Sequence, residues 1–388
     1  MINRLASLVV RELSQQFPAV LLLGPRQCGK TTLAKKIIEG AYYDLEKPSD
    51  QQIFLSDPEL ALRKISRPVV LDEAQSIPQI FPVLRSIIDD DRKKNGRFYL
   101  LGSVNPALIK HISESLAGRV GILELTPFLY PEVSGHGIDL AAHWLRGGYP
   151  DACLEADPLK RERWHESYIR TFIERDLVRY GLKTSGIEMR RFFVMLAHLH
   201  GGLLNASELG RAFGLSYHTS HRYLDILEGH YLIRRLQPYA ANIGKRLVKS
   251  PKVYVRDSGI LHYLLGIRDE NDLLANPKRG FSWEGCMMEQ LMTLETNHRP
   301  GSQFSFYRTQ AGAEIDLIIQ RGAEAVGYEF KSALSVALSD ISGLKAGLSD
   351  GVITRGVVVH LGDRRYPLSD RIEAVGGAEL VNVFQSKH

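Results

Sequence analysis

The segment GPRQCGKT at residues 24–31 constrains the fold of this chain more than any other. It matches the pattern G-x-x-x-x-G-K-[ST], in which the backbone N–H groups of a glycine-containing loop surround nucleotide phosphates. The apolar run AVLLL precedes this loop and the helix-forming run TTLAKKIIE follows it. Because the pattern requires a strand before it and a helix after it, this context predicts an α/β domain that binds ATP with Mg²⁺.

The loop residues have distinct expected roles. Lys30 is expected to reach the β- and γ-phosphate oxygens, and the Thr31 hydroxyl is expected to bind Mg²⁺. Cys28 is interpreted as a small filler of the loop, with a redox-sensing thiol as the alternative. The predicted nucleotide-binding residues are Gly24, Pro25, Arg26, Gln27, Cys28, Gly29, Lys30, Thr31 and Thr32.

A second apolar strand, in PVVLDEAQ, ends in two acidic residues about forty residues after the loop. Asp72 is expected to hold the metal through water or through Thr31. Glu73 is expected to orient and polarise the attacking water, since a metal-binding carboxylate and a catalytic base often divide these roles.

Two later positions are further candidates for catalysis. Ser103, with Asn105 nearby, follows the strand in RFYLLGSVN; it either contacts the γ-phosphate and water or is an ordinary turn residue. Arg119 precedes the strand in RVGILEL. It is expected to stabilise the transferring phosphate in its own chain or in a neighbouring subunit, with a solvated surface arginine as the alternative.

Short apolar strands alternate with helical segments over residues 1–130, which predicts a parallel α/β sheet. Residues 131–186 are expected to be helical. Residues 187–257 contain a helix-turn-helix pattern with Asn205 and Ser216 as helix caps, followed by two strands, as in a winged helix. Residues 258–388 are expected to form a C-terminal α/β domain.

These segments resemble the bacterial and archaeal AAA-type ATPases that carry a C-terminal domain of unknown function. The N-terminal half carries the resemblance in LLLGPRQCGKTTLAK, PVVLDEAQ, LLGSVNP, SLAGR, LTPFLYPEV, RGGYP and YIRTFIERDL. The C-terminal half carries it in NIGKRLVKSPKVYVRDSGILHYLLGI, WEGCMMEQL and RTQAGAEIDLII. The resemblance implies a P-loop AAA-type ATPase core, a helical segment, a winged helix and a restriction-endonuclease-like α/β domain. It does not imply a biological role.

Positive charge is concentrated in the predicted winged helix, because residues 187–256 hold eleven Lys and Arg against four Asp and Glu. Such residues neutralise phosphates and give salt-dependent DNA binding. The alternative is a winged helix that packs on the nucleotide domain and relays its conformation. The expected contacts are His218, His221 and Arg222 on the helix, and Arg234, Arg235, Lys245, Arg246, Lys249 and Lys252 on the wing.

The C-terminal segment EIDLIIQRGAEAVGYEFKSA contains the charges of a metal-dependent nuclease centre. Asp316 and Glu329 are expected to bind Mg²⁺ or Mn²⁺, and Lys331 to orient the attacking water. The resemblance adds Glu284 as the helix carboxylate, with Glu289 as a second choice. A salt-bridged, inactive remnant of such a centre is the open alternative.

Composition excludes some protein classes. No apolar run approaches the ~18 residues of a membrane span, and Arg4, Arg11 and Glu12 interrupt the first helix, unlike a signal peptide. The three cysteines are far apart, which argues against a disulfide framework. These exclusions favour a cytoplasmic protein.

Together with the motifs and the resemblance, they lead us to expect a homo-oligomeric ATPase that engages nucleic acid. The alternative is a nucleotide-gated switch or scaffold.

Overall fold

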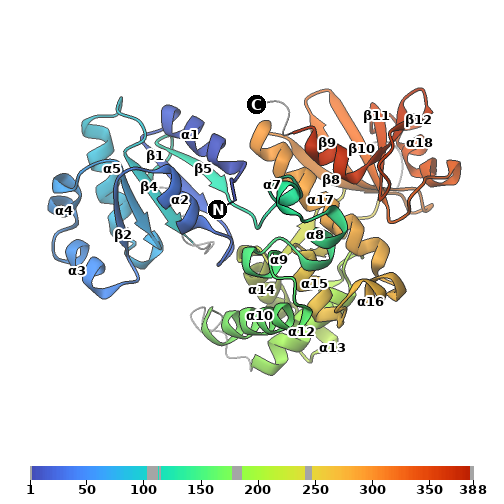
Figure 1. The fold of residues 1–388 in the computed structure, drawn as a ribbon, viewed down its shortest axis with the longest axis horizontal. Coiled ribbons are helices and arrows are strands. Elements are labelled where there is room, and N and C mark those ends of the chain that lie inside the picture. Colours follow the sequence, from blue (N-terminus) through green and yellow to red (C-terminus); the bar gives the residue numbers. More distant parts are fainter. Residues whose placement is uncertain (1, 103–111, 113–114, 177–185, 241–246, 385–388) are drawn as a thin grey trace. The chain divides into compact units, whose positions relative to one another are not determined.

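The sheet around the predicted phosphate-binding loop is all parallel. The structure is a computed structural model that describes residues 2–102, 112, 115–176, 186–240 and 247–384. It contains two compact units: an N-terminal unit of residues 1–128 with 229–231, and a C-terminal unit of 129–228 and 232–388 (Figure 1). The five strands of the N-terminal unit lie in the order β2-β3-β4-β1-β5, which confirms the predicted parallel α/β sheet.

The elements of the N-terminal unit alternate along the chain. They are α1 (Ala6–Gln16), β1 (Ala19–Leu23), α2 (Lys30–Ile37), β2 (Ala41–Asp44), α3 (Pro48–Ser56), α4 (Pro58–Lys64), β3 (Val69–Asp72), the 3-10 turn η1 (Ala74–Ser76), α5 (Ile80–Asp90), β4 (Phe98–Gly102) and β5 (Val120–Glu124). Strand residues bury alternate faces: Leu21 packs with α3, α4 and α5, and Leu22 packs with α1 and α2. Both faces of the sheet are therefore covered, as parallel sheets require.

The C-terminal unit begins with helices and a two-stranded sheet. Its first elements are α7 (Tyr130–Val133), η2 (Ser134–His136), α8 (Leu140–Arg146), α9 (Pro150–Cys153), α10 (Pro158–Thr171), the π-helix η3 (Phe172–Asp176), α12 (Gly186–His198), α13 (Ala206–Ala212), α14 (Tyr217–Gly229), β6 (Ile233–Leu236) and β7 (Lys252–Val255). Asn205 caps α13 by accepting from Glu208 N at 3.1 Å, and Ser216 accepts from Thr219 N at 3.1 Å. Both predicted caps are confirmed; the winged helix itself stays a prediction.

The rest of this unit packs helices on a six-stranded mixed sheet of order β12-β13-β11-β10-β9-β8. Its elements are α15 (Ser258–Leu265), α16 (Glu270–Ala275), α17 (Arg279–His298), β8 (Gln303–Arg308), β9 (Glu314–Arg321), β10 (Glu324–Lys331), η4 (Leu338–Ile341), α18 (Ser342–Ser349), β11 (Arg355–His360), β12 (Tyr366–Ser369), β13 (Ile372–Gly376) and α19 (Gly377–Asn382). Helix α17 lies against β10 and α18 against β9, so both helices position side chains at this sheet (Figure 1). In the described part of the chain, no helix is both long enough and apolar enough to cross a bilayer.

Candidate nucleotide-binding site and C-terminal carboxylate cluster

The phosphate-binding loop has a backbone that only certain residues tolerate. Gly24 and Gly29 have φ values of 152° and 99°, and Gln27 has a φ of 60°. A Cβ atom on Gly24 would lie 2.1 Å from the carbonyl oxygen of Leu125. Glycine is therefore required at residue 24 both for its dihedral angle and for the close approach of Leu125, the residue after β5.

Lys30 begins α2, and its ammonium lies inside the loop. It is buried, with 6% of its surface exposed, and Nζ donates to the carbonyl oxygens of Gly24 at 2.9 Å and Pro25 at 2.8 Å. Both acceptors are neutral. Because anionic phosphate oxygens are stronger acceptors than carbonyls, this ammonium is positioned to exchange the carbonyls for phosphates.

Thr31 and Asp72 meet at the carboxyl edge of the sheet. The Thr31 hydroxyl donates to Asp72 Oδ2 at 2.6 Å, and the Tyr42 hydroxyl donates to the same oxygen at 2.7 Å. Burial, together with the adjacent Asp72 carboxylate, raises the pKa of Tyr42 well above its ordinary value. A hydroxyl and a carboxylate fit Mg²⁺, which prefers oxygen donors and completes its shell with phosphates and water.

Glu73 follows directly at the end of β3. Its backbone has a φ of 51°, and its N–H donates to Asp72 Oδ1 at 2.9 Å. The Gln75 side chain donates to its carboxylate. The two acidic residues therefore share one edge, with Asp72 fixed by three donors and Glu73 turned by a left-handed backbone, a conformation often found at functional sites.

Arg4 supports the loop from behind and was not predicted to do so. Its guanidinium donates to the carbonyl oxygen of Cys28 at 2.9 Å and to that of Thr126 at 2.7 Å, and it stacks 4.9 Å from the Phe128 ring centroid. The only signal in the sequence was a cation interrupting an apolar helix. Cys28 is fully buried with Sγ 3.3 Å from Leu125 O, which agrees with its interpretation as a filler.

Arg119 lies at the wrong edge of the sheet for the role expected within its own chain. Val120 pairs with Ala19 at the start of β1, whereas the loop follows Leu23 at its other end. These two ends are about 16 Å apart for a five-residue strand. Arg119 instead forms a bidentate pair with Asp89 at 2.7 and 2.9 Å. This placement argues against a role in its own chain, and action on a neighbouring subunit stays a prediction.

Two predicted candidates, Ser103 and Asn105, lie outside the described residues. The strand that precedes them, β4, lies between β1 and β3 and ends at the same edge as the loop. Their predicted roles therefore stay predictions. The remaining loop residues, Pro25, Arg26 and Thr32, lie in the loop or the first turn of α2, and Arg26 approaches Glu46 at 4.0 Å.

The predicted C-terminal residues do come together, but they surround a lysine. We call Glu284, Glu314, Asp316 and Glu329 the carboxylate cluster. Lys252 Nζ from β7 lies 3.1 Å from Glu284, 2.6 Å from Glu314 and 3.5 Å from Asp316. Burial works to lower the pKa of Lys252, but the negative charges around it hold that pKa well above its ordinary value.

Glu329 lies at the other side of the cluster. Burial and the charge of Asp316 raise its pKa, against the opposing effect of Lys331 3.4 Å away. Asp316 Oδ2 also accepts from Phe330 N at 3.1 Å, and Arg308 pairs with Glu314 at 3.2 Å. The cluster is thus bordered by three cations: Lys252, Arg308 and Lys331.

Glu289, the second choice for the helix carboxylate, belongs to a different group. It accepts from both Arg234 and Arg256. Burial raises the pKa of Glu289, but the two guanidinium groups outweigh it and lower that pKa to about 2. Of the two candidates, only Glu284 reaches the cluster. Within the described chain, no three His, Cys, Asp or Glu side chains are grouped as a metal ion would require.

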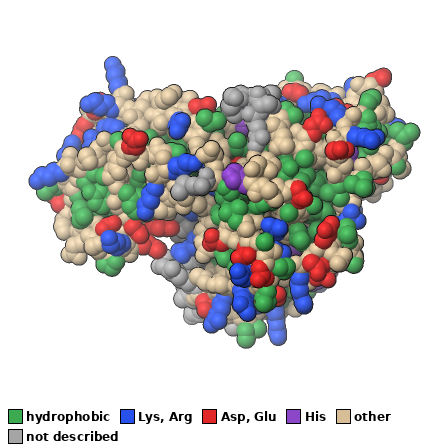
Figure 2. All heavy atoms as spheres, in the orientation of Figure 1, with side chains coloured by type: hydrophobic (Ala, Val, Ile, Leu, Met, Phe, Trp, Pro, Cys, Tyr) green, Lys and Arg blue, Asp and Glu red, His purple; other side chains and the backbone are tan. Residues whose placement is uncertain are grey.

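The basic residues expected to contact DNA are partly used within the protein. Arg234 pairs with Glu289, Arg235 pairs with Asp225 and Glu228, and Lys252 is 1% exposed. Lys245 and Arg246 lie outside the described residues. Figure 2 shows Lys and Arg interspersed with Asp and Glu over the lower helices around α10 and α12. The local positive charge therefore does not correspond to one exposed basic surface on that face.

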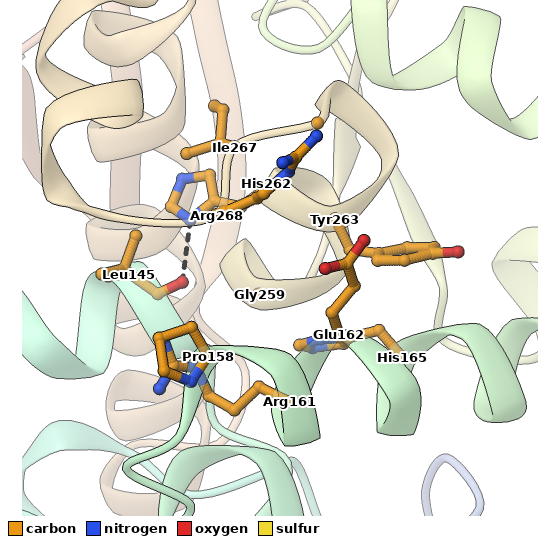
Figure 3. Close-up of a pocket in the computed structure, with 11 residues that line it drawn as sticks. Leu145, Pro158, Arg161, Glu162, His165, Gly259, His262, Tyr263, Ile267 and Arg268 are labelled. Carbon is orange, nitrogen blue, oxygen red and sulfur yellow. Dashed lines mark hydrogen bonds between the residues drawn. The ribbon is translucent and has the colours of Figure 1, made fainter.

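A small pocket lies between α10 and α15 in the C-terminal unit (Figure 3). Its volume is about 100 Å³, enough for a few waters but not for a nucleotide. His262 is held by Leu145 O at 2.9 Å and Ser282 Oγ at 2.7 Å. His165 Nε2 is buried without a protein hydrogen-bond partner, and burial lowers the pKa of His165 to about 4.

Comparisons with known proteins agree with this division of sites. Uncharacterised proteins of Mycobacterium tuberculosis and Mycobacterium bovis are each 40% identical over 382 residues, covering 98% of this chain and 84% of theirs. The chain belongs to their family. Residues 16–134 match an AAA domain, and residues 137–271 and 279–380 match two domains of unknown function, DUF8612 and DUF4143. The N-terminal site therefore lies in an AAA domain, and the four residues of the carboxylate cluster lie in the last domain, whereas Lys252 lies in the domain before it.

Two solved structures that match this chain show low overall similarity to it. A STAND-class signal-transduction ATPase with a tetratricopeptide repeat sensor from Pyrococcus horikoshii is 11% identical, with a TM-score of 0.25. The match covers 78% of this chain and 48% of that protein. A Vibrio cholerae protein is 13% identical over 95% of this chain and 97% of its own, with a TM-score of 0.22. At these TM-scores, neither structure informs the function of this chain.

Proposed function

We propose that this family member binds MgATP in its N-terminal unit and hydrolyses it, and that the nucleotide cycle acts on the C-terminal unit. The observation that carries the proposal is the Thr31–Asp72 hydrogen bond of 2.6 Å, with Glu73 next in the chain and Lys30 inside the loop. Lys30 would bind phosphate oxygens, Thr31 and Asp72 would hold the hydrated metal, and Glu73 would polarise the attacking water.

In an oligomer, Arg119 of one subunit would supply a further positive charge to the ATP bound by its neighbour. Arg119 lies at the amino edge of the sheet and is 19% exposed at its side chain, paired with Asp89. To act on ATP bound by a neighbouring subunit, Arg119 would have to leave Asp89 and contact the phosphate groups of that ATP. We therefore expect ATP to favour a homo-oligomer, which light scattering with and without ATP would detect.

The test of hydrolysis is phosphate release by wild type, Lys30→Ala and Glu73→Gln, with Lys64→Ala as an exposed lysine control. We expect Lys30→Ala to lose roughly 100-fold or more, since it removes a charge from the transition state. Glu73→Gln should still bind ATP but lose turnover. If wild type shows no Mg²⁺-dependent ATP hydrolysis, either alone or with DNA, the proposal is contradicted.

A nucleotide-gated switch or scaffold is a second candidate. It is favoured by the carboxylate cluster, where buried ion pairs replace the open positions that a catalytic metal centre needs. In that case the C-terminal domain would be inactive and serve for contacts. Tight ATP binding with negligible turnover would favour the switch over the ATPase.

Engagement of nucleic acid is the finer part of the ATPase proposal. With three wing cations in internal ion pairs, DNA contact would fall mainly on His218, His221 and Lys249. Binding would then be weak and salt-dependent, with a log–log slope of about −0.9 per phosphate contacted. Duplex binding at two salt concentrations, for wild type and for Lys249→Ala, tests this part independently of turnover.

A further inference from the structure

Lys252 occupies the centre of the carboxylate cluster. It is the first residue of β7, and its side chain is 1% exposed. Three carboxylates from α17 and β9 lie within 3.5 Å of its ammonium. These are oxygens that a nuclease-like metal centre would use, so the ammonium and a metal compete for the same donors.

Tyr254 strengthens this arrangement from the same strand. Lys252 and Tyr254 are two residues apart and therefore face the same side of β7. The Tyr254 hydroxyl donates to Glu284 Oε1 at 2.5 Å, the same oxygen that Lys252 contacts. This oxygen therefore already has two donors, and a metal bound to it would compete with both of them.

Charge balance also disfavours a metal beside this lysine. Lys252, Arg308 and Lys331 border the four carboxylates of the cluster. A divalent ion bound by Glu284 and Asp316 would lie next to the Lys252 ammonium, which is 1% exposed, so water would screen their repulsion only weakly. The residues present therefore do not fit the metal that a restriction-endonuclease-like centre would hold.

We infer that the ammonium of Lys252 is the built-in cation of the carboxylate cluster, which therefore binds no divalent metal and instead fastens β7 to the C-terminal sheet. This ion-pair lock joins two segments that match different domains of unknown function, residues 137–271 and 279–380. It makes the cluster a structural connection between those domains. The lock does not depend on the proposed ATPase activity.

Mn²⁺ alone, measured by its electron paramagnetic resonance signal, tests this inference on the full chain without nucleotide. All proteins carry Thr31→Ala and Asp72→Asn, which remove both expected metal ligands of the N-terminal site. The comparison is between this background, Lys252→Met, and Lys345→Met as the control, since Lys345 is exposed on α18 and is not one of the cations that border the cluster. We expect at least tenfold tighter Mn²⁺ binding only for Lys252→Met.

Two results would overturn the inference. The first is Mn²⁺ binding by the background protein that disappears on Asp316→Asn; this comparison needs no change at Lys252, so it holds even if Lys252→Met fails to fold. The second is a folded Lys252→Met that binds Mn²⁺ no better than Lys345→Met. Because nucleotide is absent throughout, failure here is distinguishable from failure of the ATPase proposal.

Discussion

The two units each contain a buried lysine at a cluster of oxygens, and the oxygens differ. Lys30 is 6% exposed and donates to two backbone carbonyls, whereas Lys252 is 1% exposed and lies among three carboxylates. A neutral carbonyl holds an ammonium without neutralising it. A carboxylate neutralises it, and the pair is then costly to separate.

The difference shows why the same residue type indicates a ligand site in one unit and a structural contact in the other. Around Lys30 the backbone is forced into left-handed conformations at Gly24, Gln27 and Gly29, which keeps N–H groups and the ammonium directed at a ligand. Around Lys252 the charges are paired with one another. We therefore expect Lys30 to bind a ligand, and we expect substitution of Lys252 to change the stability of the C-terminal unit.

The largest expected effect separates the two lysines directly. Lys252→Met should destabilise the C-terminal unit by about 3–5 kcal/mol, because it leaves buried carboxylates without their cation. Lys30→Met should change the stability of the N-terminal unit by no more than about 1 kcal/mol, because only neutral acceptors lose a partner. Equal losses for the two variants would break the comparison.

The units can be followed separately in this experiment. All three tryptophans, Trp144, Trp164 and Trp283, belong to the C-terminal unit, so their fluorescence in urea reports its unfolding. Hydrogen exchange of peptides from β1 and β4 reports the N-terminal unit.

Glu289 gives the next largest effect and sharpens the role of charge pairing. Its pKa is lowered to about 2, from an ordinary 4.5, because Arg234 and Arg256 outweigh burial. Glu289→Gln should therefore cost about 3 kcal/mol at pH 7. A carboxyl group whose pKa is lowered by folding stabilises the folded state at pH values above its pKa in the unfolded chain. The difference in unfolding free energy between wild type and Glu289→Gln should therefore narrow as pH falls from about 4.5 toward 2.

Tryptophan fluorescence in urea at pH 7 and at pH 4 measures this effect. Glu324→Gln is the control, since Glu324 is about half exposed and pairs weakly with Arg321 and Arg355. An unchanged Glu289→Gln difference across this pH range would show that the pairing is not the cause.

Gly24→Ala tests whether the strained loop belongs to the ligand site. The new Cβ would meet Leu125 O at 2.1 Å, at a φ of 152°. We expect about 2 kcal/mol of destabilisation from overpacking, together with loss of ATP binding. Gly135→Ala, where a Cβ meets nothing within 4 Å, should change neither quantity. If Gly24→Ala bound ATP as tightly as wild type, nucleotide binding would not depend on the conformation of this loop.

The smallest effect concerns Tyr42. Tyr42→Phe removes one of the donors to Asp72 Oδ2 and should cost about 1 kcal/mol in the N-terminal unit. Tyr43→Phe is its control, because the neighbouring Tyr43 ring packs on Phe54. Hydrogen exchange of β2 and β3 peptides measures both variants, and an equal effect of the two would show that the hydrogen bond to Asp72 is not important.

The nucleotide site could be predicted from the sequence because its chemistry is local. Gly24 to Thr32 are contiguous, and Asp72 and Glu73 end the next long apolar strand, so a pattern and its context locate both groups. The position of Arg119 could also be predicted from the sequence. A residue just before a parallel strand lies at the amino edge of the sheet, opposite a loop that follows a strand.

The carboxylate cluster was only half predictable. Asp316 and Glu329 were visible as strand charges, and they do lie together, but Lys252 was assigned to a solvent-exposed wing. Its partners Glu284 and Glu314 are 32 and 62 residues away in the chain, so only the packing of β7 against α17 and β9 identifies it as buried. Charge counting over residues 187–256 could not distinguish paired from exposed cations.

The most direct test of the contrast between the two lysines is a crystal of the full chain grown with Mn²⁺ and a non-hydrolysable ATP analogue. Mn²⁺ can be located by its anomalous scattering. We predict one Mn²⁺ beside Thr31 and the phosphates, with the Lys252 ammonium still among Glu284, Glu314 and Asp316. An Mn²⁺ ion bound by Glu284 and Asp316, with Lys252 displaced, would contradict the account.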